Sequence, residues 1–111
     1  MSRFSIRKMQ IAFLFTLAFL FCSLVARAQG QAAASYKTKC VACHAADGTG
    51  SEVGKKLGTH DFHSSQVHGE SDADMTQIIA KGKNKMPAYE KSLKPDEIKG
   101  LVAYVRELGK Q

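Results

Sequence analysis

The chain has 111 residues, of which 44% are hydrophobic and 23% charged, and a formal net charge of +6. This length suits one domain and is too short for a barrel enzyme or a doubly wound nucleotide-binding fold. Four basic residues and no acidic residue precede residue 29, so the rest of the chain carries only +2. The basic character is therefore weak evidence for nucleic-acid binding, and we expect no nucleic-acid partner.

The N-terminus has the three parts of a secretory signal peptide. A basic stretch precedes an apolar run over 11–25, and Ala26 and Ala28 then supply the small residues that a signal peptidase reads. The run is shorter than the roughly 20 residues of a membrane-spanning helix, although an uncleaved anchor is the alternative. We predict that 1–28 are removed on export to a bacterial periplasm. Residues 29–111 then form the mature domain, without stable membrane insertion.

Three helices are predicted in the mature domain, at 31–43, 72–81 and 95–108. In the first, Ala32, Tyr36 and Cys40 share one helical stripe. Capping residues precede the second helix and Gly82 follows it, while Pro95 stands in the first turn of the third. The segment between the first two helices, 44–70, has no sustained apolar period and is predicted to be a long loop. No strand is expected.

The apolar residues are few for a domain of this size. The expected core side chains are Tyr36, Val41, Leu57, Ile78, Ile79, Leu93, Ile98, Leu101, Tyr104, Val105 and Leu108. A domain of 83 residues, 29–111, has a thin core and usually needs a disulfide, a metal or a cofactor. The sequence therefore predicts an all-α shell of helices around an apolar object.

One motif carries chemistry: residues 40–44 read Cys-Val-Ala-Cys-His. C-x-x-C-H is the attachment site of c-type haem. Two thiols at this spacing lie on one side of a helical turn and can add to the two vinyl groups of one porphyrin edge. His44 then projects beneath the ring, where it can bind iron. We expect its second ring nitrogen to donate to a backbone carbonyl within 53–57.

Two other uses of Cys40 and Cys43 are the alternatives to haem attachment. A redox disulfide normally belongs to a strand–helix setting, which this sequence lacks. A structural zinc site needs four ligands, and no second cysteine pair completes one. One haem c, attached through Cys40 and Cys43 with His44 on its iron, is therefore the favoured prediction.

The second axial ligand is predicted to be Met86, with alternatives Met75, His60, His63 and His68. Met86 lies in a polar segment, and Pro87 stiffens the backbone that carries its sulfur. Met75 shares an apolar helix face and is expected in the core, while the histidines are expected to be solvated. His/Met ligation raises the reduction potential and leaves no open site for oxygen or substrate. This favours an electron relay over an enzyme.

Lysines cluster around the proposed ligand, at Lys81, Lys83 and Lys85. A solvated face is the plain interpretation of such a cluster. Beside a cofactor edge, the same charges would steer an acidic protein partner.

Taken together, the mature chain resembles small soluble class I cytochromes c along essentially its whole length. The residues that carry the resemblance are Cys40, Cys43, His44, Gly48, Gly50, Gly82, Lys83, Met86, Pro87, Ala88, Tyr89, Leu101 and Tyr104. The resemblance implies an all-α class I cytochrome c fold of three to five short helices around one covalently bound haem. It also implies that the N- and C-terminal helices cross, with Ala32 and Tyr36 against Leu101 and Tyr104.

In function, the resemblance implies a monomeric carrier that passes single electrons between protein partners. The alternatives are a haem-bearing subunit of a larger oxidoreductase complex and a ligand-sensing haem protein. Three features depart from the family: Ala32 stands where glycine is common, no proline precedes Leu57, and His60, His63 and His68 have no counterpart.

Overall fold

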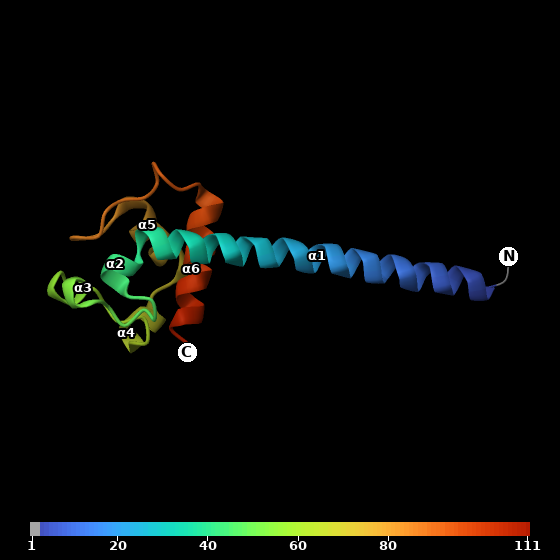
Figure 1. The fold of residues 1–111 in the computed structure, drawn as a ribbon, viewed down its shortest axis with the longest axis horizontal. Helices are drawn as coiled ribbons and strands as arrows, with labels where there is room; N and C mark the ends of the chain where they lie inside the picture. Colours follow the sequence, from blue (N-terminus) through green and yellow to red (C-terminus); the bar gives the residue numbers. More distant parts are fainter. Residues whose placement is uncertain (1–2) are drawn as a thin grey trace. The chain divides into compact units, whose positions relative to one another are not determined.

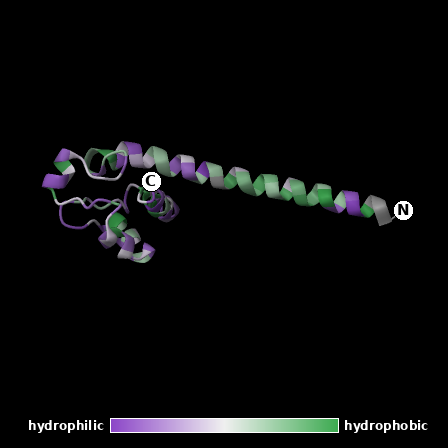
Figure 2. Cartoon of the chain, turned by 90° about the horizontal axis from the view of Figure 1, so that it is seen from below, coloured by the Kyte–Doolittle hydropathy of each residue, from purple (hydrophilic) through white to green (hydrophobic). Residues whose placement is uncertain are grey.

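The computed structural model describes residues 3–111, and the chain divides into two units at residue 30. The first unit is the N-terminal part of α1 (Arg3–Lys39). The large apolar side chains that the structure describes in this unit are exposed, and Figure 2 shows this part of the helix green over much of its length. The stretch Ile6–Lys39 is long and apolar enough to cross a membrane, a test that N-terminal signal sequences also pass. It is compatible with the predicted signal peptide, whose cleavage stays a prediction.

The second unit, 31–111, contains the end of α1 and five further helices (Figure 1). These helices are α2 (Val41–His44), α3 (Glu52–Lys56), α4 (Ser65–Gly69), α5 (Asp72–Lys81) and α6 (Pro95–Leu108). Across residues 3–111 there is no strand, only an isolated antiparallel bridge between Lys83 and Met86. The predicted all-α fold is confirmed.

The predicted boundaries of α5 and α6 agree with the structure, and local hydrogen bonds explain them. The Ser71 hydroxyl caps α5 by accepting a hydrogen bond from the Asp74 N–H, at 3.1 Å. Gly82, at φ 78°, ends the helix. At the start of α6, the Glu97 carboxylate accepts from the backbone N–H of Lys94, at 2.7 Å, and Pro95 stands in the first turn.

Two predictions about the helices were wrong. The helix expected over 31–43 is interrupted at Cys40, and α2 starts at Val41. The loop expected over 44–70 contains the short helices α3 and α4. Each begins at a serine whose hydroxyl accepts a backbone N–H: Ser51 from Gly54 at 3.0 Å, and Ser64 from Val67 at 3.3 Å. Five-residue helices are too short to show an apolar period, so only their caps could have revealed them.

The core lies where the end of α1 crosses α6. The rings of Tyr36 and Tyr104 are 5.2 Å apart, and Gln31 donates a hydrogen bond to Glu97 at 2.8 Å. The helix crossing implied by the resemblance is therefore present. The buried apolar side chains are Ala32, Tyr36, Phe62, Val67, Met75, Ile79, Leu93, Ile98, Leu101, Val102, Val105 and Leu108.

Several core predictions need correction. Leu57 is 45% exposed, and Val41, Ile78 and Tyr104 are only partly buried. In their place, Phe62 and Val67 from the predicted loop are buried. The expectation that Met75 belongs to the core is confirmed.

Candidate functional site

A large cavity opens in the second unit, with walls from the end of α1, from α2, α5 and α6 and from the segments between them. Its empty space is about 1290 Å³, a volume that includes open solvent at the mouth. The apolar wall consists of Tyr36, Leu57, Phe62, Val67, Met75, Ile78, Ile79, Leu93, Leu101 and Val105. The cavity therefore suits a mainly apolar ligand.

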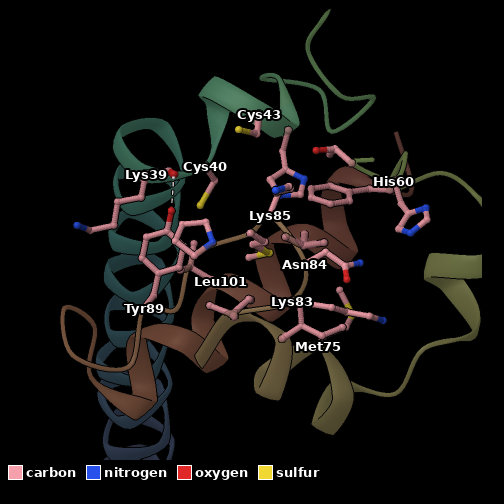
Figure 3. A pocket seen from close by; sticks show the side chains of 18 of the residues that line it. Lys39, Cys40, Cys43, His60, Met75, Lys83, Asn84, Lys85, Tyr89 and Leu101 are labelled. Atoms are coloured by element: carbon pink, nitrogen blue, oxygen red, sulfur yellow. Dashed lines mark hydrogen bonds between the residues drawn. The ribbon is translucent and has the colours of Figure 1, made fainter. Parts of the chain in front are cut away.

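The thiols of Cys40 and Cys43 both line this cavity (Figure 3). Both are partly buried and unpaired, so the disulfide considered from the sequence is not formed. Burial raises the pKa of the Cys40 thiol. Within 3–111, no three His, Cys, Asp or Glu side chains gather closely enough to hold a metal ion, and the zinc alternative gains no support.

His44 enters the same cavity at the end of α2. Its ring stacks on Phe62, with centroids 4.9 Å apart and planes at 26°. Burial lowers the pKa of His44 and so favours the neutral imidazole, the form that binds metals. Phe62 was missed from the sequence because a lone aromatic in a polar stretch has no periodic signal.

The Nδ1 atom of His44 is buried and has no hydrogen-bond partner in the described chain. The predicted acceptor within 53–57 is therefore not found. The carbonyls of Val53 and Gly54 instead accept the N–H of Leu57, at 3.1 and 2.9 Å, and Gly54 also accepts from Thr59, at 2.9 Å. A buried nitrogen without a partner is costly in a protein interior and marks a place where a further group is expected.

Backbone contacts with the α3 region fix the turn that carries the thiols. The Ser51 N–H donates to the Cys43 carbonyl at 2.9 Å, and the Ser51 hydroxyl donates to the Ala42 carbonyl at 2.7 Å. A Cβ at Gly54 would lie 1.8 Å from the Cys43 carbonyl oxygen. Only glycine permits this approach, so α3 packs directly on α2.

Met86 reaches the cavity from a tight turn after α5. The Met86 N–H donates to the Lys83 carbonyl at 2.9 Å, and the Lys83 N–H donates to the Met86 carbonyl at 3.2 Å. A Cβ at Gly82 would lie 2.6 Å from that same Met86 oxygen. Met86 is partly buried and packs against the core, so the turn holds it at the wall of the cavity that His44 also lines.

The other candidate ligands are distributed unevenly. Met75 and His60 line the cavity, Met75 from α5 and His60 from the segment before α4. His63 instead pairs with Asp61, Nδ1 to Oδ1 at 2.6 Å, and His68 Nε2 lies 3.2 Å from the Gly109 carbonyl. The structure therefore brings Met86, Met75 and His60 to the cavity of His44, but not His63 or His68.

The lysines also separate into two groups. Lys39, Lys83 and Lys85 line the cavity, whereas the Lys81 ammonium donates to Glu90 at 2.5 Å. Lys83 is 4.0 Å from the Glu70 carboxylate. The positive charge beside the cavity thus comes from Lys83 and Lys85 of the predicted cluster and from Lys39, which lies outside that cluster.

Comparisons with known proteins agree on the type of domain. A family model described as "Cytochrome C oxidase, cbb3-type, subunit III" matches residues 27–105. A solved structure, the "KustC0563 c-type cytochrome", is 29% identical, with a TM-score of 0.65, and the match covers 68% of this chain and 94% of that one. A search of the curated proteins found no match.

Proposed function

Since the chain belongs to the c-type cytochromes, in the family of cbb3-type cytochrome c oxidase subunit III, we propose that it is an exported monohaem electron carrier with His44 and Met86 as iron ligands. A c-type cytochrome contains covalently bound haem c, whose iron takes up and releases one electron. Cys40 and Cys43 are the proposed attachment residues. Haem-based electron transfer follows from the family, and the assignment of these residues is our proposal.

The observation that carries the proposal is the meeting of four side chains at one apolar cavity. Cys40, Cys43, His44 and Met86 come from two segments about 40 residues apart and all line it. Both thiols are free, as attachment requires. Burial lowers the pKa of His44 and so favours the neutral imidazole, whose buried Nδ1 atom lacks a partner; a neutral imidazole can present a nitrogen to a metal.

The apolar wall, Phe62 and the turn that carries Met86 would each contribute to binding the cofactor. The apolar wall excludes water, which favours a porphyrin and raises the energetic cost of charge inside. Phe62 stacks on His44 and fixes the plane of its ring. The turn at Lys83–Met86 presents a thioether, a soft ligand that favours ferrous iron. Two protein ligands would leave no position for a substrate, which supports a carrier rather than an enzyme.

Paired methionine variants test the ligand assignment. We expect Met86→Leu to abolish the far-red sulfur-to-iron band of the ferric protein and to lower its reduction potential. Met75→Leu is the matched control, because Met75 lines the same cavity but is buried in the core. Loss of the band in Met75→Leu, with the band retained in Met86→Leu, would transfer the role to Met75.

Lys39, Lys83 and Lys85 suggest how a partner would dock. Positive charge beside the cavity attracts an acidic protein surface and accelerates encounter. We expect electron-transfer rates with acidic partners to fall with rising ionic strength. Lys85→Glu should slow the reaction more than Lys99→Glu, an equal charge change on α6 outside the cavity wall. Equal effects of the two variants would exclude docking at the cavity.

A second candidate function is a haem-bearing subunit of a larger oxidoreductase complex. The description of the matching family favours it, whereas the matched solved structure is described simply as a c-type cytochrome. Purification of the native protein distinguishes the two. A monomer released without detergent supports the carrier, and co-purification with other chains through detergent and salt supports the subunit.

A further inference from the structure

Tyr89 connects the segment carrying Met86 to the end of α1. Its hydroxyl donates a hydrogen bond to the backbone carbonyl of Lys39, at 3.0 Å and across 50 residues of sequence. Figure 3 shows this bond at the edge of the cavity, beside Cys40. Tyr89 therefore joins the two parts of the chain that carry the proposed attachment and ligand residues.

The Lys39 carbonyl is available because α1 ends there. In a continuous helix it would accept the N–H of Cys43, four residues on. Here the Cys43 N–H donates to the Cys40 carbonyl instead, at 3.1 Å. Carbonyls at a helix end need partners from outside the helix, and the Tyr89 hydroxyl is the partner of this one.

Hydrogen bonds to α5 also fix the backbone around Tyr89. Its N–H donates to the Ile79 carbonyl, and the Glu90 N–H donates to the Ala80 carbonyl, both at 3.1 Å. Burial raises the pKa of the Tyr89 hydroxyl, which keeps it protonated as a donor at neutral pH. Met86 lies only three residues earlier, and its own backbone bonds reach no farther than Lys83.

We propose that Tyr89 is a positioning residue for the Met86 sulfur: its hydroxyl ties the 82–89 segment to the Lys39 carbonyl and so limits how often Met86 leaves the cavity. This role rests on the proposed function, in which Met86 binds the iron. The Tyr89 aromatic ring also lines the cavity, so removal of the hydroxyl alone separates the hydrogen bond from the packing.

The test compares Tyr89→Phe with Tyr104→Phe in the haem-loaded protein. Tyr104 packs on Tyr36, and its hydroxyl has no hydrogen bond within the described residues, so its loss removes no such contact. Carbon monoxide can reach ferrous iron only when Met86 has left. Loss of one neutral hydrogen bond should raise this open population, and with it the rate of carbon monoxide binding, by roughly 3- to 10-fold in Tyr89→Phe. Tyr104→Phe should bind at the wild-type rate.

Hydrogen exchange supplies a readout that does not depend on the iron. The amides of Tyr89 and Glu90 should exchange faster in Tyr89→Phe, while the amides of α6 stay as protected as in the wild type. Unchanged carbon monoxide binding, or an equal increase in Tyr104→Phe, overturns the role of Tyr89 and leaves the proposed function standing. A far-red band that survives in Met86→Leu overturns both.

Discussion

Gly82→Ala should disturb the Met86 turn through two effects that the structure allows to be separated. Gly82 has φ +78°, a backbone conformation that residues other than glycine rarely adopt. A Cβ there would lie 2.6 Å from the Met86 carbonyl oxygen and 3.0 Å from the Ala88 nitrogen. Both neighbours are backbone atoms, so a change of side-chain rotamer cannot relieve the contact.

The expected loss of stability follows from these two effects. A non-glycine residue in such a conformation costs about 1–3 kcal/mol, and added bulk in a packed site costs about 1–3 kcal/mol more. Gly82→Ala should therefore lower the free energy of unfolding by about 2–6 kcal/mol. Against the roughly 5–15 kcal/mol typical of natural domains, this is a large fraction.

Urea unfolding of the haem-loaded protein measures this loss, with Gly58→Ala as the control. Gly58 has φ +86°, yet a Cβ there meets no atom within 4 Å, so this variant introduces the backbone strain alone. The difference between the two variants gives the cost of the contact with the Met86 turn. Equal destabilisation in Gly58→Ala and Gly82→Ala would refute the argument from close approach.

Two further substitutions test other hydrogen bonds. The backbone N–H of His63, and then its side chain, lower the pKa of Asp61, so the stabilisation from Asp61 is full above pH about 3.9 and is lost as the pH falls through the lower folded pKa. Asp61→Asn should be less stable than wild type at pH 7, and this gap should narrow as the pH falls through the folded pKa of Asp61; a gap independent of pH would contradict the assignment. Arg106 donates to the carbonyls of Val67 and Glu70 from two different guanidinium nitrogens, and Arg106→Lys, which has a single nitrogen in place of this fork, should lower urea stability by about 1–3 kcal/mol. Wild-type stability in that variant would show that the bonds contribute little.

The sequence was most informative where a helix is long enough for its apolar residues to recur at helical spacing. The boundaries of α5 and α6 were predicted correctly, because Ser71, Gly82 and Pro95 mark their ends and apolar residues recur at helical spacing. The break at Cys40 was not foreseen. The break leaves the Lys39 carbonyl to accept a hydrogen bond from Tyr89, 50 residues away, a tertiary contact that no local pattern encodes.

The site was predictable in chemistry but not in its supporting contacts. The spacing of Cys40, Cys43 and His44 indicated haem attachment, and the family match agrees with a c-type cytochrome. The packing of Phe62 on His44 could not be foreseen, because it depends on how a polar segment folds back. Leu57 was expected in the core because it is apolar, but it lies at the cavity wall with 45% exposure.

The close approach at Gly54 limits mutational tolerance at one corner of the domain. Any side chain there would push α3 away from the Cys43 carbonyl oxygen, only 1.8 Å from where a Cβ would stand. The same displacement would break the hydrogen bond from Ser51 to Cys43. In a saturation library, position 54 should accept glycine alone, while exposed Val53, its immediate neighbour, should accept many replacements.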